Sequence, residues 1–70
     1  MEDYITIFIN GEPFNCNSSM SLKSILIYLN INISSVIIEY NNQIIDQLSF
    51  GSLFFVNNDR LEIITIAGGG

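Results

Sequence analysis

The hydrophobic positions in the first part of the chain alternate with polar ones, which predicts a β-hairpin. Residues 4–9 place three isoleucines on one side and Tyr4, Thr6 and Phe8 on the other, the period of a half-buried strand. Asn10-Gly11 follows, and these two residue types tolerate the positive φ angles of a type I′ turn best. The returning strand is expected at residues 13–17, with Phe14 and Cys16 on its inner face.

The pattern then changes to the period of a helix. Ser21 is expected to cap a helix that runs from Leu22 to about Leu29. The apolar stripe of this helix falls at i, i+3, i+4 and i+7 and consists of Leu22, Ile25, Leu26 and Leu29. Such a stripe predicts a helix that packs one side against a sheet, and Asn30 is suited to end it because asparagine tolerates the left-handed conformation.

The second half of the chain predicts three further strands. Residues 36–40 are largely apolar and β-branched, which favours an inner strand buried on both faces; Asn41-Asn42 then turns the chain into a short strand at 43–45. Residues 46–58 lack a regular pattern, and Asp59 is expected to cap the turn before a last strand at 61–66. The apolar residues of the irregular segment are expected to pack under the fold; they are Leu48, Phe50, Leu53, Phe54 and Val56. This order predicts one α+β domain at residues 1–67, with one main helix on one face of a mixed sheet.

Composition excludes several classes of function. The 70-residue chain has a net charge of −5 with only two Lys and Arg residues, so it offers no basic patch for nucleic acid, and a basic protein partner fits better. It has no histidine and one cysteine, which leaves no metal site or Cys-His pair to expect. Cys16, with no cation nearby in sequence, is expected in the core.

Location in the cell is predicted from the same composition. No apolar stretch is long enough to span a membrane, and the acidic start Met1-Glu2-Asp3 is unlike a signal peptide. We therefore expect an intracellular protein in the cytoplasm, with the plastid stroma as an alternative.

The candidate reactive group is the carboxylate of Gly70, at the end of a flexible tail formed by Gly68, Gly69 and Gly70. Glycine has no Cβ, so such a tail can thread a narrow passage into another protein's active site. There the carboxylate can attack the α-phosphate of ATP, and the resulting acyl-adenylate can react with sulfur to give a thiocarboxylate or with an amine to give an amide. A frayed terminus without function, or a cloning remnant, is the alternative. Partner docking is expected on the sheet face near the tail, with Phe8, Ile64 and Ile66 as candidates.

Several segments together resemble the ThiS family of sulfur carriers in thiamine biosynthesis. They are Ile9-Asn10-Gly11-Glu12, the helix start Ser21-Leu22 with Ile25-Leu26, Glu39-Tyr40-Asn41, Gln43-Ile44-Ile45, Asp59-Arg60-Leu61-Glu62-Ile63 and Ala67-Gly68-Gly69-Gly70. Two departures are Asn57-Asn58, where the family often has a glycine before Asp59, and the absence of Pro-Arg after Ile45.

The resemblance implies a ubiquitin-like β-grasp fold and a carrier that is not itself an enzyme. It implies that an E1-like enzyme of the ThiF type consumes ATP to adenylate Gly70, with no cofactor bound to the carrier. A cysteine desulfurase would supply sulfur, and the thiocarboxylate would be used by a thiazole synthase of the ThiG type. The alternatives are a MoaD-like carrier for molybdopterin synthesis, a ubiquitin-like protein modifier, and an interaction module with an inert tail.

Overall fold

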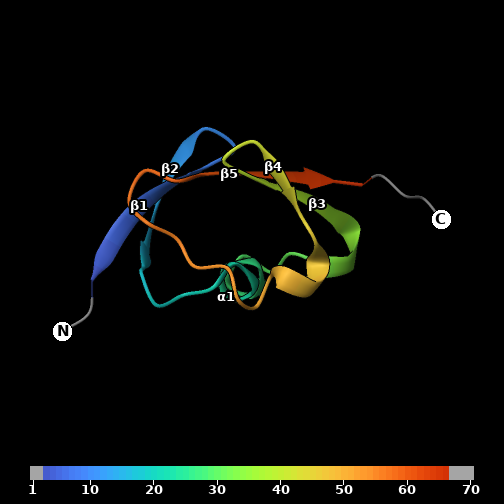
Figure 1. The fold of residues 1–70 in the computed structure, drawn as a ribbon, viewed down its shortest axis with the longest axis horizontal. Coiled ribbons are helices and arrows are strands. Elements are labelled where there is room, and N and C mark those ends of the chain that lie inside the picture. Colours follow the sequence, from blue (N-terminus) through green and yellow to red (C-terminus); the bar gives the residue numbers. More distant parts are fainter. Residues whose placement is uncertain (1–2, 67–70) are drawn as a thin grey trace.

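The computed structural model describes residues 3–66, and Figure 1 shows a sheet on one side with a helix below it. The first hairpin consists of β1 (Tyr4–Ile9) and β2 (Glu12–Asn17), and helix α1 spans Leu22–Tyr28. A short 3₁₀ helix, η1 (Ile33–Ser35), leads into β3 (Val36–Tyr40) and β4 (Gln43–Ile45). A second one, η2 (Gln47–Ser49), precedes the last described strand, β5 (Arg60–Thr65).

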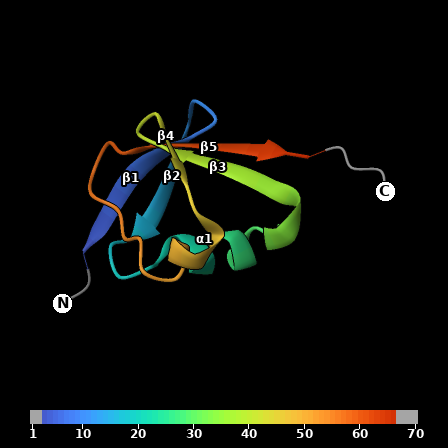
Figure 2. The ribbon, with the colours of Figure 1, turned by 45° about the vertical axis from the view of Figure 1, so that its right-hand side comes forward.

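The five strands form one mixed sheet in the order β2-β1-β5-β3-β4. Among residues 3–66, only the β1–β5 pair is parallel; the pairs β1–β2, β5–β3 and β3–β4 are antiparallel. β5, which follows all other strands in sequence, therefore lies at the centre of the sheet. The structure confirms the predicted α+β class, the mixed sheet and the single main helix on one face (Figure 2).

The core lies between α1 and the sheet. Its buried members are Ile7, Cys16, Leu22, Ile25, Leu26, Ile38, Phe50, Phe55 and Leu61. The predicted helix stripe is confirmed, with Leu29 half-buried at its C-terminal end. Burial raises the pKa of the Cys16 thiol, so Cys16 is an unreactive core residue, as expected.

The polar residues at the predicted turns and caps act as the sequence indicates. The Ser21 hydroxyl accepts a hydrogen bond from the Ser24 N–H at 3.2 Å and so caps α1. Asn30 ends the helix with φ of 60°. Asn10 and Gly11, with φ of 51° and 84°, form the first hairpin turn, and Asn41 and Asn42 make the second with positive φ at both positions.

Two predictions about burial are wrong. β3 lies inside the sheet, but α1 covers only one face, so Ile37 on the other face is 39% exposed. In the segment after η2 the extended backbone alternates sides: Leu53 and Phe55 turn inward, while Phe54 and Val56 are 52% and 65% exposed.

Leu48 is the third misplaced residue of that segment and is 92% exposed. It lies in the tight turn of η2, where its own N–H donates to the Asp46 side chain at 3.3 Å. Phe50, predicted inside, is buried.

Candidate functional site

The structure describes the part of the chain that leads to the candidate reactive group. The predicted site residues Gly68, Gly69 and Gly70 lie outside the described residues. β5 is held between β1 and β3, and the Ile66 N–H extends the pairing by donating to the Ser35 carbonyl at 2.8 Å. The position of Ile66 is therefore set by the centre of the sheet.

Asp59 fixes the start of β5. Its side chain is only 6% exposed, and Oδ2 accepts hydrogen bonds from the Tyr40 hydroxyl at 2.6 Å and the Val56 N–H at 2.9 Å. Oδ1 accepts a third from Asn41 Nδ2 at 3.2 Å. The bond from Val56 confirms the expectation that Asp59 caps this turn. The sequence did not indicate its bonds to Tyr40, at the end of β3, and to Asn41, in the turn that follows.

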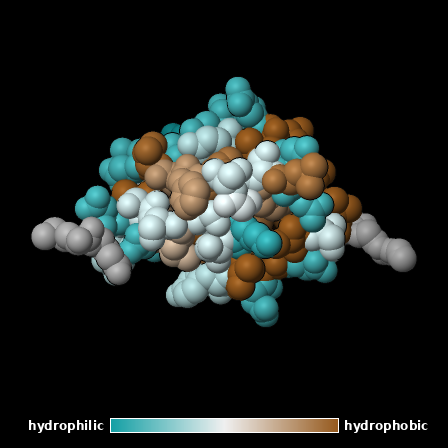
Figure 3. Space-filling view, turned by 60° about the horizontal axis from the view of Figure 1, so that its bottom comes forward, coloured by the Kyte–Doolittle hydropathy of each residue, from teal (hydrophilic) through white to brown (hydrophobic). Residues whose placement is uncertain are grey.

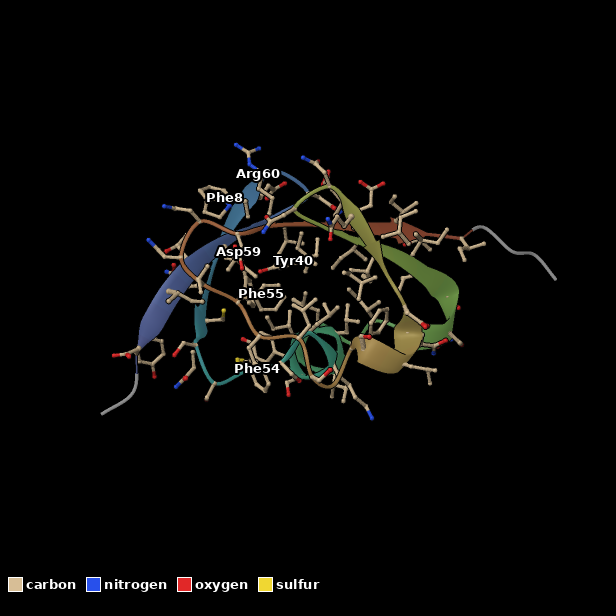
Figure 4. All side chains as sticks on the ribbon, in the orientation of Figure 1. Phe8, Tyr40, Phe54, Phe55, Asp59 and Arg60 are labelled. Atoms are coloured by element: carbon tan, nitrogen blue, oxygen red, sulfur yellow. The ribbon has the colours of Figure 1, made fainter. Side chains whose placement is uncertain are left out.

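Tyr40 lies beneath the sheet between Asp59 and Phe55 (Figure 4). Its ring makes an edge-to-face contact with Phe55, with centroids 5.7 Å apart. Burial, together with the hydrogen bond to Asp59 and its negative charge, raises the pKa of Tyr40 to about 12. The hydroxyl therefore stays protonated at neutral pH and acts as a hydrogen-bond donor that ties β3 to the start of β5.

The loop before β5 keeps its shape without the glycine that the resembling family often has. Asn58 adopts φ of 74°, a left-handed conformation that asparagine tolerates better than most residues. The Asn57 side chain accepts a hydrogen bond from the Thr6 N–H at 2.8 Å, and the Asn58 N–H donates to the Thr6 carbonyl at 2.7 Å. Both asparagines therefore attach the loop to β1.

Asn10 does more than form a turn. Its N–H donates to the Leu61 carbonyl at 2.8 Å. Its side-chain Oδ1 accepts from the Ile63 N–H at 2.8 Å, and its Nδ2 donates to the Ile63 carbonyl at 3.3 Å. The side chain thus satisfies both backbone groups of Ile63, as a strand residue would, and the Asn-Gly pattern alone did not indicate this contact.

The three predicted docking residues lie on the open face of the sheet but do not form one cluster. Phe8 is opposite Arg60, and both point away from α1 (Figure 4). Ile64 is opposite Ile37 on β3. It follows Arg60 by four residues, so it lies about 13 Å further along β5 than the position of Phe8. Ile64 is 45% exposed and Ile66 48% exposed.

The apolar surface next to the tail is instead formed by isoleucines. We call it the isoleucine patch; its members are Ile37, Ile64 and Ile66, all of which are exposed. Ile44 is exposed on the same face but lies opposite Glu39, on the outer strand β4. Ile37 and Ile44 were not among the predicted docking residues, although alternation along strands 36–40 and 43–45 could have indicated them.

Charged residues separate Phe8 from the isoleucine patch. Glu39 on β3 is directly opposite Glu62 on β5. A hollow of about 140 Å³ beside them is lined by Phe8, Gly11, Glu39, Asn42, Arg60 and Glu62. Two like charges at opposed strand positions destabilise a sheet, so packing within this domain does not account for the pair.

The described residues show neither a metal-binding cluster nor a membrane span. Within residues 3–66, no group of three or more His, Cys, Asp or Glu side chains could hold a metal ion. No helix among these residues is both long and apolar enough to cross a membrane.

The face of the domain on which α1 lies mixes hydrophobic and hydrophilic residues across its surface (Figure 3).

Comparisons with known proteins find relatives over nearly the whole chain. A protein named "Uncharacterized protein ycf40" from Porphyra purpurea is 46% identical over 66 residues, covering 94% of this chain and 93% of that protein. A thiazole synthase from Paramagnetospirillum magneticum is 33% identical over 64 residues, which cover 91% of this chain but 20% of the synthase.

A solved structure and a family model agree with these relatives. The thiamine biosynthesis protein (ThiS) from Geobacter metallireducens has a TM-score of 0.80 at 22% identity, covering 94% of this chain and 100% of that one; it shows that the fold is that of a ubiquitin-like β-grasp domain. The model of the ThiS family matches residues 7–70. Because that match runs from within β1 through the helix and the other strands to Gly70, the chain belongs to the ThiS family.

Proposed function

We propose that this protein is a sulfur carrier for thiazole formation in thiamine biosynthesis. The observation that carries the proposal is the family match, which extends through Gly70. The thiazole synthase relative supports the choice of pathway, since it contains a stretch similar to this chain within the same polypeptide. The protein acts as a co-substrate of partner enzymes and is not a catalyst.

In the proposed reaction the Gly70 carboxylate oxygen attacks the α-phosphate of ATP in the active site of an E1-like adenylating enzyme. Pyrophosphate leaves, and a glycyl-adenylate forms. The terminal sulfur of a persulfide formed by a cysteine desulfurase then attacks the glycyl carbonyl, and AMP leaves. A thiol cleaves the resulting acyl disulfide, which forms a new disulfide and releases the thiocarboxylate. Thiazole synthase receives this sulfur, in the cytoplasm or the plastid stroma.

The domain's part in this proposal is to hold the tail at a defined place. Asp59 and Asn10 fix the two sides of β5, and the strand leads directly to Ile66. A reacting carboxylate must be held within about 3 to 3.5 Å of its target while water is excluded. We propose that Gly68 and Gly69 form the thread that reaches both active sites.

Mass spectrometry of the protein purified from its own cell tests the function. Exchange of one oxygen for sulfur adds about 16 Da, and we expect this increase on the C-terminal peptide. A lysine-linked adduct would instead indicate a protein modifier, and an unmodified terminus in cells that are making thiamine would contradict the proposal. Loss of molybdopterin rather than thiamine synthesis on gene deletion would indicate a MoaD-like carrier.

The tail is tested separately by ATP-pyrophosphate exchange with the adenylating enzyme. A Gly69→Val variant and a chain ending at Gly69 should both lose exchange, because the first adds side-chain bulk and the second withdraws the carboxylate by about 3.5 Å. Equal exchange in all three proteins, with the fold intact, would show that the tail is not the reactive part.

We propose that the isoleucine patch docks the adenylating enzyme. Ile64→Ser should weaken binding, and Ile27→Ser is the matched control, because Ile27 is 63% exposed on α1, across the domain from the patch. The same binding measurement on Phe8→Ser tests the predicted docking residue that lies outside the patch, and on Ile66→Ser the predicted residue nearest the tail. Equal affinities for the Ile64 and Ile27 variants would refute the patch.

A further inference from the structure

The edge of β5 that faces β1 becomes free after Ile63. β1 pairs with β5 only at Phe8↔Arg60 and Ile9↔Leu61. The Asn10 backbone and side chain then continue the contact as far as Ile63. Figure 2 shows β5 running on beside β3, past the β1–β2 hairpin.

The register of β5 against β3 identifies which backbone groups are exposed at this free edge. In an antiparallel pair, residues alternate between hydrogen-bonded and non-hydrogen-bonded positions. Asn41 donates to Arg60 and Ile66 donates to Ser35, so the even-numbered residues of β5 bond toward β3. Thr65, opposite Val36 at a non-hydrogen-bonded position, directs its N–H and C=O to the other side.

No described residue occupies that side at Thr65. Between residues 3 and 66, the structure gives no hydrogen-bond partner to the Thr65 N–H or C=O, and Thr65 is exposed. An unpaired donor and acceptor on a strand edge form a template for another strand. The outer strands of the sheet are protected, β2 by Pro13 and β4 by its length of three residues, whereas residues 64–66 contain neither proline nor charge.

We propose that thiazole synthase adds an extended segment of its own chain to this edge, pairing with the Thr65 N–H and C=O. The inference rests on the proposed function for its choice of partner. Main-chain pairing supplies a fixed register in strand addition, and Ile64 and Ile66 on either side of Thr65 offer apolar contacts to the added segment. The pairing thereby sets how far the tail enters the synthase.

Proline at position 65 tests the pairing. Thr65→Pro removes only the N–H that faces the free edge, because the donors of Ile64 and Ile66 toward β3 remain, and strand geometry suits the residue before a proline. Thr65→Val is the matched control, since it keeps the N–H and removes the hydroxyl. We expect Thr65→Pro to bind thiazole synthase at least about tenfold more weakly than Thr65→Val in calorimetry, as for the loss of one interfacial hydrogen bond.

Hydrogen exchange on the wild-type chain gives a second readout that needs no variant. The Thr65 amide should exchange rapidly in the free carrier and at least about tenfold more slowly with saturating thiazole synthase. The amides of Ile64 and Ile66 are the internal controls, because the first is bonded to β3 and the second to Ser35 in both states. Unchanged Thr65 exchange in the complex would overturn the inference, as would equal binding of folded Thr65→Pro and Thr65→Val.

If Thr65→Pro fails to fold, the exchange result alone decides. A carrier that shows the thiocarboxylate mass but no Thr65 protection refutes the strand pairing and leaves the proposed function standing. A carrier without the thiocarboxylate refutes the function whatever the exchange result.

Discussion

Replacing Tyr40 with phenylalanine removes one oxygen from the network that holds β5, and its effect can be estimated from the structure. The ring and its contact with Phe55 remain, so the change isolates the 2.6 Å hydrogen bond to Asp59. A hydrogen bond to a charged group contributes about 1.5 to 3 kcal/mol. For a domain of this size, a loss of about 2 kcal/mol lowers the melting temperature by roughly 8 to 16 °C.

The same substitution should change the response to alkaline pH. The pKa of Tyr40 is raised in the folded state to about 12 from its ordinary 10. Between these values the unfolded chain has lost the Tyr40 proton and the folded chain has kept it, so stability falls as pH rises from about 10 to about 12. The Tyr40→Phe variant lacks this contribution, and its stability deficit should shrink across that range.

Urea unfolding followed by circular dichroism at pH 7 and at several values between pH 9 and 12 measures both effects. Tyr28→Phe is the control, because Tyr28 is 72% exposed. If Tyr40→Phe matches the wild type in midpoint at pH 7 and in alkaline slope, the hydrogen bond to Asp59 does not stabilise the fold.

Three further substitutions test other parts of the fold. Leu26→Ala empties a fully buried position and should cost about 2 to 5 kcal/mol in urea unfolding; a smaller loss than that of an exposed control, Ile27→Ala, would contradict the packing. Glu62→Gln removes the like-charge pair with Glu39 and should stabilise by about 0.2 to 1 kcal/mol, an effect that added salt reduces, and no gain at low salt would refute the repulsion. Asn58→Val should destabilise because a β-branched residue is strained at φ of 74°, by about 1 to 2 kcal/mol, whereas Asn58→Gly should be close to neutral; equal midpoints would contradict the strain.

Local patterns predicted much of this fold because each reports a local requirement. Ser21 and Asn30 mark the helix ends through their own hydrogen bonding and backbone preference. The alternation in residues 4–9 reports which side of a strand is buried, and that holds wherever one face is solvated. The same reasoning failed for Phe54 and Val56 because an irregular segment gives no period by which to tell an extended stretch from a coil.

The arrangement of the candidate site depends on which strands pair and in which register, and local sequence patterns do not indicate this. Alternation places Phe8 and Ile64 on the same face, but only the register reveals that Glu39 and Glu62 lie between them. Asn10 likewise reads as a turn residue, and its bonds to Ile63 depend on a parallel pairing between the first and last described strands. Contacts across 53 positions of sequence are set by the topology of the whole sheet.

The central place of β5 also has a consequence for synthesis on the ribosome. β1 and β3, each half of a hairpin that can form early, meet only through a strand that emerges after both. A nascent chain lacking residues 60–65 leaves an empty slot in the middle of the sheet and exposes Ile38 and Ile7 to water, so it cannot complete its core. Folding therefore waits until residues 60–65 are free to insert between β1 and β3, and a chain terminated before them would be removed by proteases.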